Sequence, residues 1–232
     1  MKNIQQLTDS LKTDLAFFHP HVISSAFLYG AGADTADAPA GLPVRAGLVF
    51  TDPSPSAIRP FLPMVKKYRK QVVFPFALSQ RFLQESLDTF PLEILEFQSD
   101  CRPLLGENPL TGLAPDARNI RLQCERELKG KGMHLRSALF HRTRDSELRE
   151  LIHRSSGDFH RIYLGILTLK GAPIALSPVQ AAGRVAELCG LPDDTLVHVA
   201  RNDVPQKQVY DFFVRYLAQI DKLTSLVDGG LL

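Results

Sequence analysis

The sequence predicts an α/β fold, with a small mixed β-sheet domain followed by an all-α helical bundle. In the first part of the chain, short apolar runs bounded by Gly, Pro and Asp alternate with segments whose apolar residues recur every three or four positions. This is the pattern of strands alternating with helices. A loop-like segment at residues 104–109 ends the alternation, and almost every segment beyond it has helical periodicity. We therefore expect two domains, residues 1–110 and residues 111–232.

The first domain is expected to contain three helices and four strands. Leu7, Leu11 and Leu15 are spaced as on one helical face, and they predict an opening helix that ends before Pro20. Ser79 stands where a short helix needs its N-cap. In chain order we predict a helix at 4–18, strands at 26–29 and 46–51, a helix at 56–70, a strand at 72–76, a helix at 79–87 and a strand at 90–97.

The second domain is expected to be a bundle of about five helices. Asp116 is placed to cap a long helix whose buried stripe includes Cys124 and Leu128. Gly130 and Gly132 lie inside that helix, and each glycine costs about 1 kcal/mol relative to alanine. We therefore expect close approach of another backbone there, or a kink. The predicted helices cover residues 117–141, 145–155, 158–169, 178–188, with Ser177 as N-cap and Pro178 in the first turn, and 205–227.

The composition is that of an ordinary soluble protein. Of 232 residues, 44% are hydrophobic and 22% charged, and the polar N-terminus is unlike a secretory signal. No run approaches the roughly 18 apolar residues that a membrane span needs. A net charge of +2 and the absence of tryptophan give no clear nucleic-acid surface and no attraction to a membrane. Cys101, Cys124 and Cys189 encode neither a disulfide framework nor a Cys-x-x-Cys metal site, so we expect a cytoplasmic protein.

A glycine turn between two predicted strands is the first candidate for a ligand site. The strand at 26–29 ends at Gly30, Ala31 and Gly32, and the chain returns as the strand at 46–51. Small residues at such a turn allow a phosphate to approach the backbone N–H groups. Lys70 ends a basic stretch that could line a phosphate-binding cleft. The predicted ligand-binding residues are therefore Gly30, Ala31, Gly32 and Lys70.

These two strands and three later segments resemble a known family. Residues 28–50 resemble the core of the nucleotidyltransferase superfamily, in which a strand ending in Gly-Ser is followed by Asp-x-Asp on the next strand. The segments DTFPLEILE at 88–96, LGENPL at 105–110 and RLQCERELKGK at 121–131 are similar to bacterial predicted nucleotidyltransferase-domain proteins with a helical C-terminal half. The resemblance covers roughly residues 20–165. It implies backbone donors around phosphates, and divalent metals held by carboxylates.

The sequence departs from the family pattern at the metal site. Ala31 stands where the family has serine, and the two aspartate positions fall at about Val44 and Ala46. Glu93 lies where the third carboxylate is expected, on the last predicted strand, with Glu96 on the opposite face of that strand. One carboxylate cannot hold two Mg²⁺ ions against water. The resemblance therefore implies a nucleotidyltransferase-like scaffold that is catalytically degenerate.

Three functions are open at this point. The leading hypothesis is a degenerate nucleotidyltransferase-like protein that binds a nucleotide or another phosphate-bearing small molecule. The second is an active nucleotidyltransferase that uses Glu93, Glu96 and Asp52, with Mg²⁺ as its cofactor. The third is a protein-interaction module that acts through the helical half, as a homodimer or with another protein.

Overall fold

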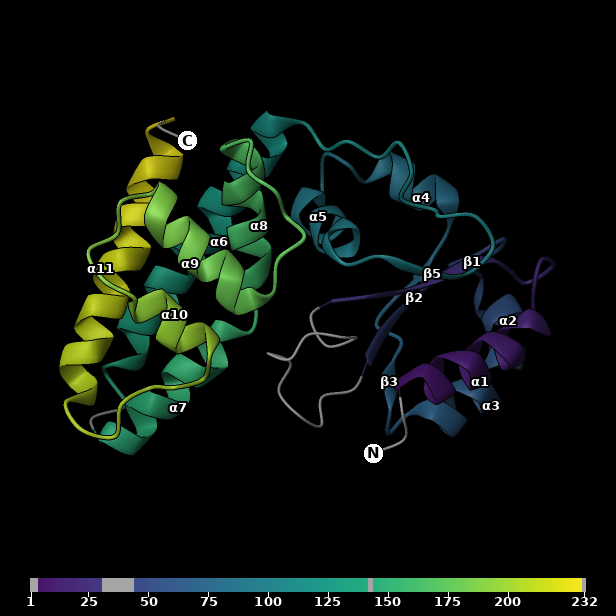
Figure 1. Cartoon of the computed structure of the whole chain (residues 1–232), viewed down its shortest axis with the longest axis horizontal. Coiled ribbons are helices and arrows are strands. Elements are labelled where there is room, and N and C mark those ends of the chain that lie inside the picture. The colour runs from purple at the N-terminus through teal and green to yellow at the C-terminus, as the bar shows by residue number, and fades with distance from the viewer. Residues whose placement is uncertain (1–3, 31–43, 142–143, 231–232) are drawn as a thin grey trace. The chain divides into compact units, whose positions relative to one another are not determined.

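The computed structural model describes residues 4–30, 44–141 and 144–230 (Figure 1). The chain divides into two compact units. The sheet unit comprises residues 1–87 and 96–114, and the helical unit comprises residues 88–95 and 115–232. Among the described residues, no helix is both long enough and apolar enough to cross a membrane.

Five described strands form a small mixed sheet, which confirms the predicted sheet type but not the predicted set of four strands. The order across the sheet is β3-β2-β1-β5, and β4 also pairs with β2. The central strand β1 is antiparallel to β2 and β5, whereas β2 is parallel to β3 and β4. The strands are β1 (Ile23–Tyr29), β2 (Val44–Phe50), β3 (Val72–Val73), β4 (Ala77–Leu78) and β5 (Arg102–Leu105).

The described helices of the sheet unit are short, apart from the first. The predicted helix at 56–70 is broken into three segments, since Pro60 and Pro63 each stand in the first turn of a new one. Proline lacks the N–H that a helix interior needs, so it is tolerated only in a first turn. Ser79 caps its helix as predicted, and its Oγ accepts from Phe82 N at 3.1 Å. The helices are α1 (Ile4–Ala16), α2 (Pro55–Ile58), the 3₁₀ segment η1 (Arg59–Phe61), α3 (Leu62–Tyr68) and α4 (Gln80–Glu85).

The two faces of the sheet carry different side chains. On one face, Leu28, Ala46 and Leu48 belong to an apolar cluster that also contains Leu11 of α1 and Met64 of α3. Figure 1 shows α1 and α3 side by side. The other face is aromatic, because the rings of Phe27, Tyr29 and Phe97 pack edge to face or tilted, with centroids 4.8–5.8 Å apart. Side chains alternate between faces along a strand, so the register decides which residues face the α1 and α3 helices.

The prediction of a strand at residues 90–97 is wrong. This segment is the helix α5 (Pro91–Ser99). Leu92, Ile94, Leu95 and Phe97 are all at most 4% exposed, so the helix is apolar on most sides. A short apolar run of this kind has no clear period, and it cannot be told from a buried strand by pattern alone. Pro91 suits the first turn of a helix, where its missing N–H has no partner to lose.

One strand lies partly in the segment that was predicted to be a loop. β5 (Arg102–Leu105) pairs antiparallel with β1 at one edge of the sheet. Its Pro103 weakens the strand signal in the sequence, yet proline is tolerated on an edge strand because no further strand needs its N–H. This edge strand anchors the chain between α5 and the helical unit's first long helix.

Beyond residue 114, the described part of the helical unit contains the five predicted helices and a sixth that was missed. The missed helix, α10, has only six residues, which is too short for a clear period. Asp116 caps the long helix by accepting from Arg118 N at 2.7 Å, and Ser177 forms a capping box with Gln180. The helices are α6 (Ala117–Ala138), α7 (Asp145–Ser156), α8 (Phe159–Leu169), α9 (Pro178–Leu188), α10 (Thr195–Ala200) and α11 (Val209–Asp228).

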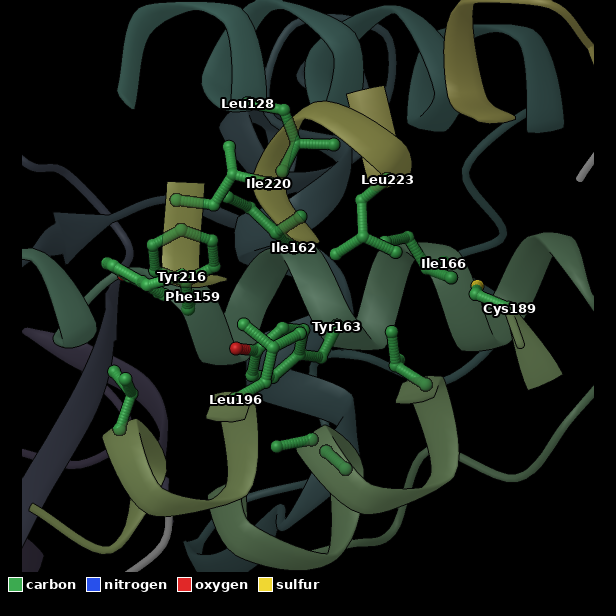
Figure 2. Close-up of a cluster of buried hydrophobic side chains, with 14 of the residues drawn as sticks. Leu128, Phe159, Ile162, Tyr163, Ile166, Cys189, Leu196, Tyr216, Ile220 and Leu223 are labelled. Atoms are coloured by element: carbon green, nitrogen blue, oxygen red, sulfur yellow. The ribbon is translucent and has the colours of Figure 1, made fainter. Parts of the chain in front are cut away.

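The core of the helical unit surrounds α8. Figure 2 shows Ile162 and Ile166 of α8 pointing toward Ile220 and Leu223 of α11, with Leu128 of α6 beside them. All of these side chains are at most 1% exposed. The apolar stripes that predicted these helices are therefore the surfaces that they bury.

Gly165 allows α8 to pack closely against its neighbours. A Cβ atom at this position would lie 2.5 Å from Cys124 Sγ and 2.5 Å from Leu92 Cδ2.

We predict that Gly165→Leu lowers the free energy of unfolding by about 3 kcal/mol, since overpacking of a tight core typically costs 1–3 kcal/mol. Gly130→Leu is the matched control, because a Cβ there meets nothing within 4 Å. That control is expected to stabilise α6 by roughly 1 kcal/mol. Chemical denaturation followed by far-UV circular dichroism measures both, and equal effects of the two substitutions would contradict the packing argument.

Candidate functional site

The structure brings Gly30 and the segment of Lys70 to the same end of the sheet, where β1 ends and β2 and β3 begin. Tyr29, the last residue of β1, pairs with Arg45 near the start of β2. The N–H of Val44 donates to the carbonyl of Gln71 at 2.9 Å, just before β3 begins. Neighbouring strands lie about 4.8 Å apart. Gly30 and the backbone of residues 70–71 are two strand spacings apart at this end of the sheet, which is roughly 10 Å. Two of the predicted ligand-binding positions, Ala31 and Gly32, lie outside the described residues.

Gly30 requires glycine for its conformation rather than for space. Its φ is +85°, in the left-handed region that L side chains rarely adopt. A Cβ atom there would lie 3.6 Å from Arg45 Cδ, which is an ordinary contact distance. Position 30 is therefore one that favours glycine.

Val44 and Ala46, where the sequence resemblance places the two aspartates, face the apolar cluster of the sheet unit. Ala46 is 0% exposed within that cluster, and Val44 packs against it. Arg45 points to the opposite face, where its Nη1 donates to Glu96 Oε1 at 2.7 Å. The carboxylate of Glu96 is thus engaged by a cation, and its side chain is only 12% exposed. A carboxylate at position 46 would be buried among apolar side chains, and one at position 44 would lie beside them in a partly buried position.

Glu93 is held by two side chains of the helical unit. Its Oε2 accepts from Gln123 Nε2 at 2.9 Å, and its Oε1 accepts from Arg161 Nη1 at 3.0 Å. Gln123 also accepts from the backbone N–H of Leu92 at 2.9 Å. Arg161 continues the chain of contacts to Asp158, at 3.2 Å. These bonds satisfy both oxygens of Glu93 and explain how a carboxylate that is 19% exposed is stabilised.

Glu93 and Glu96 are three residues apart on a helix and not on the two faces of a strand. This corrects the predicted alternation, since positions i and i+3 of a helix lie on neighbouring parts of its surface. The carboxylates nevertheless have separate partners, Arg161 for Glu93 and Arg45 for Glu96.

Asp52 lies at the other end of β2 from Gly30. Six residue steps separate Val44 from Phe50, which corresponds to about 20 Å of strand. The carboxylate of Asp52 accepts from the backbone N–H of Ser54 at 2.9 Å and from its hydroxyl at 2.8 Å. The hydroxyl of Ser54 lowers the pKa of Asp52. The structure therefore does not bring Asp52 together with Gly30 and Glu96, and it places this residue in a turn before α2.

A basic pocket lies on the side of the sheet unit where α1 and α3 meet. Its volume is about 920 Å³. Four cationic side chains and one carboxylate line it, together with neutral polar groups. The sequence predicted Lys70 as a ligand-binding residue and its basic stretch as a possible phosphate-binding surface, but it did not indicate α1. The lining residues are Gln6, Leu7, Asp9 and Ser10 of α1 and the segment from Lys66 to Gln71, and this set is called the basic pocket below.

Three cations of the basic pocket are available to a ligand. Lys67 is paired, since its Nζ lies 2.5 Å from Asp14 Oδ2, and the hydroxyl of Tyr68 donates to the same oxygen at 2.8 Å. The bond from Lys67 holds the pKa of Asp14 below its ordinary value and raises the pKa of Lys67. Lys66, Arg69 and Lys70 are exposed, and they have no ion-pair partner in the part of the chain that the structure describes.

Comparisons with known proteins leave the site to be interpreted from its own residues. No protein-family model, no curated protein and no solved structure matches this chain. Within residues 4–30, 44–141 and 144–230, no group of three or more His, Cys, Asp or Glu side chains is placed to hold a metal ion. What the described residues do present is a pocket with unpaired cations.

Proposed function

We propose that this protein binds a phosphate-bearing ligand, a nucleotide in particular, in the basic pocket, on a nucleotidyltransferase-like scaffold that is catalytically degenerate. The observation that carries the proposal is the set of three unpaired cations, Lys66, Arg69 and Lys70, around one pocket. Exposed cations that converge without carboxylate partners attract an anion, and lysine and arginine are the usual phosphate ligands of proteins.

The size and lining of the basic pocket favour a nucleotide over a bare phosphate ion. A volume of about 920 Å³ falls near the top of the range for small-molecule sites, which is roughly 300–1,000 Å³. Gln6, Ser10 and Gln71 add neutral hydrogen-bonding groups. The carboxylate of Asp9 would repel a phosphate but can accept from a ribose hydroxyl or a base N–H. The cations therefore suit the phosphates, and the α1 side suits the nucleoside.

The sheet supports the degenerate part of the proposal. The glycine with positive φ after β1 and the following antiparallel strand match the scaffold that the resemblance implies. The paired carboxylates that a two-metal mechanism needs are replaced by Val44 and Ala46, which face the apolar cluster. On this proposal the protein binds a phosphate group but lacks the paired carboxylates that would hold the metal ions for catalysis.

Substitution of two pocket lysines tests the proposal. We expect the wild-type protein to bind ATP and pyrophosphate in isothermal titration calorimetry, with or without Mg²⁺. The double substitution Lys66→Ala and Lys70→Ala is expected to weaken both affinities at least about tenfold, since each charged contact with phosphate contributes roughly 1 kcal/mol or more.

The matched control is the double substitution Lys12→Ala and Lys207→Ala. It removes two exposed lysines that do not line the basic pocket, so the net charge changes equally. Affinity lost equally in both double variants would show a nonspecific charge effect. An absence of ATP and pyrophosphate binding in the wild-type protein would overturn the proposed function.

A further inference from the structure

One surface of the helical unit combines exposed apolar side chains with a regular pattern of charge. It is formed by one stripe of α6 and its continuation and one stripe of α11, and is called the α6/α11 face below. The apolar side chains of this face are 48–84% exposed. Exposed apolar side chains that lie together on one surface are typical of an interaction site. The α6 stripe contains Leu122, Arg126, Lys129, Met133, Arg136 and Phe140, and the α11 stripe contains Tyr210, Val214, Asp221 and Asp228.

Two ion pairs show that the stretches 129–136 of α6 and 221–228 of α11 lie next to one another and run antiparallel. Arg136 Nη2 lies 2.5 Å from Asp221 Oδ2, and Lys129 Nζ lies 3.2 Å from Asp228 Oδ2. The partners are seven residues apart on each helix, so both pairs lie in line along the same side. A Cβ at Gly132 would lie 3.9 Å from Ile220 Cγ2, which is an ordinary contact distance. The predicted close approach of another backbone is therefore wrong at Gly132, where the nearest atoms belong to side chains, and at Gly130, where a Cβ would meet nothing within 4 Å.

The charges of the α6/α11 face are separated by helix. The cations of the face, Arg126, Lys129 and Arg136, lie on α6, and its anions, Asp221 and Asp228, lie on α11. Glu125 lies beside the α6 stripe, where it pairs with Lys129 at 2.5 Å. A second copy related by a twofold axis parallel to the helices would set the basic α6 stripe against the acidic α11 stripe, and the reverse. Lys129 of one copy would then lie opposite Asp228 of the other copy, and Asp228 of the first opposite Lys129 of the second. The four charges of these two ion pairs would alternate in sign.

We propose that the α6/α11 face is the interface of a homodimer. The charge pattern is complementary to itself under this operation, which a chemically different partner would match only by coincidence. This inference is independent of the proposed ligand.

The first test is the mass of the full chain in solution. Size-exclusion chromatography with light scattering across a dilution series is expected to give the mass of two chains. Met133→Glu is expected to give the mass of one chain, because it places a carboxylate at the centre of the apolar stripe. Met133 is 62% exposed, so the fold should be retained, as circular dichroism would verify. The control Leu62→Glu changes a residue of the sheet unit that is 53% exposed, and it should remain dimeric.

The second test uses charge reversal, which reports on contact between the charged groups themselves. Lys129→Glu alone makes positions 129 and 228 both negative, and Asp228→Lys alone makes them both positive, so each variant should be monomeric. Mixing the two variants should restore dimers, since negative groups then face positive ones across the interface. A monomeric wild-type protein would overturn the proposal, as would a dimer that survives Met133→Glu or a mixture of the charge variants that stays monomeric.

Discussion

Substitution of Ala46 by aspartate, which introduces one of the carboxylates that the proposed nucleotidyltransferase-like scaffold lacks, is expected to destabilise the sheet unit by about 3 kcal/mol or more and to create no Mg²⁺ site. Ala46 is 0% exposed and belongs to the apolar cluster between the sheet and the α1 and α3 helices. Burying a polar group there without a hydrogen-bond partner lowers the free energy of unfolding by roughly 2–7 kcal/mol, and burying a charged group lowers it by more. The carboxyl group would therefore be protonated or would disrupt the packing, and neither state binds a hard cation.

Urea denaturation with and without Mg²⁺ measures this effect. Val73→Asp is the matched control, because it adds the same group on a neighbouring strand at a position that is 40% exposed. The control is expected to cost less than about 1 kcal/mol. If Ala46→Asp instead kept wild-type stability and gained stabilisation by Mg²⁺, the position would face a metal site and the prediction would be wrong.

The sequence predicted those parts of the fold in which local signals agree with the packing. Ser79, Asp116 and Ser177 all cap helices as expected, because capping depends on the residue and its immediate neighbours. The strands β1 and β2 are apolar runs between breakers, and both were found. The errors lie where tertiary contacts decide. Residues 91–99 are apolar on most sides and could form a strand or a helix, and β5 contains a proline that only an edge position accepts.

The candidate site was less predictable because its residues are distant in the sequence. Lys70 was identified from a basic run, but Gln6, Asp9 and Ser10 join it from a helix some sixty residues earlier. The partners of Glu93 are 30 and 68 residues away, so no local pattern could show that its oxygens are already occupied. The sequence alone shows that Val44 and Ala46 carry no carboxylate. Only the register of β2 shows that these positions also face the apolar cluster.

Glu93→Ala is expected to destabilise the helical unit by about 1–3 kcal/mol, to the same extent with and without Mg²⁺. The substitution removes the acceptor of Arg161 Nη1 and of Gln123 Nε2, and Gln123 is only 5% exposed. Removing one partner of a largely buried pair leaves the donors of the other partner without an acceptor. This loss destabilises the protein by more than the intact pair stabilises it. Glu93→Gln keeps an acceptor oxygen for one of these donors and should lose about half as much.

The same variant separates a structural role for Glu93 from the metal-binding role of the active-enzyme hypothesis. Glu187→Ala is the control, since that carboxylate is 70% exposed in its ion pair with Arg184 and should change the free energy of unfolding by less than about 1 kcal/mol. A structural Glu93 changes stability but leaves the affinity for ATP unchanged, because the proposed ligand site is the basic pocket. A catalytic Glu93 would instead abolish a Mg²⁺-dependent stabilisation by ATP while the lysine variants of the basic pocket retained it. Because the two sets of residues lie in separate compact units, each can be altered without disturbing the other's local contacts, and thermal denaturation with ATP, with Mg²⁺ and with both assigns the ligand to one of them.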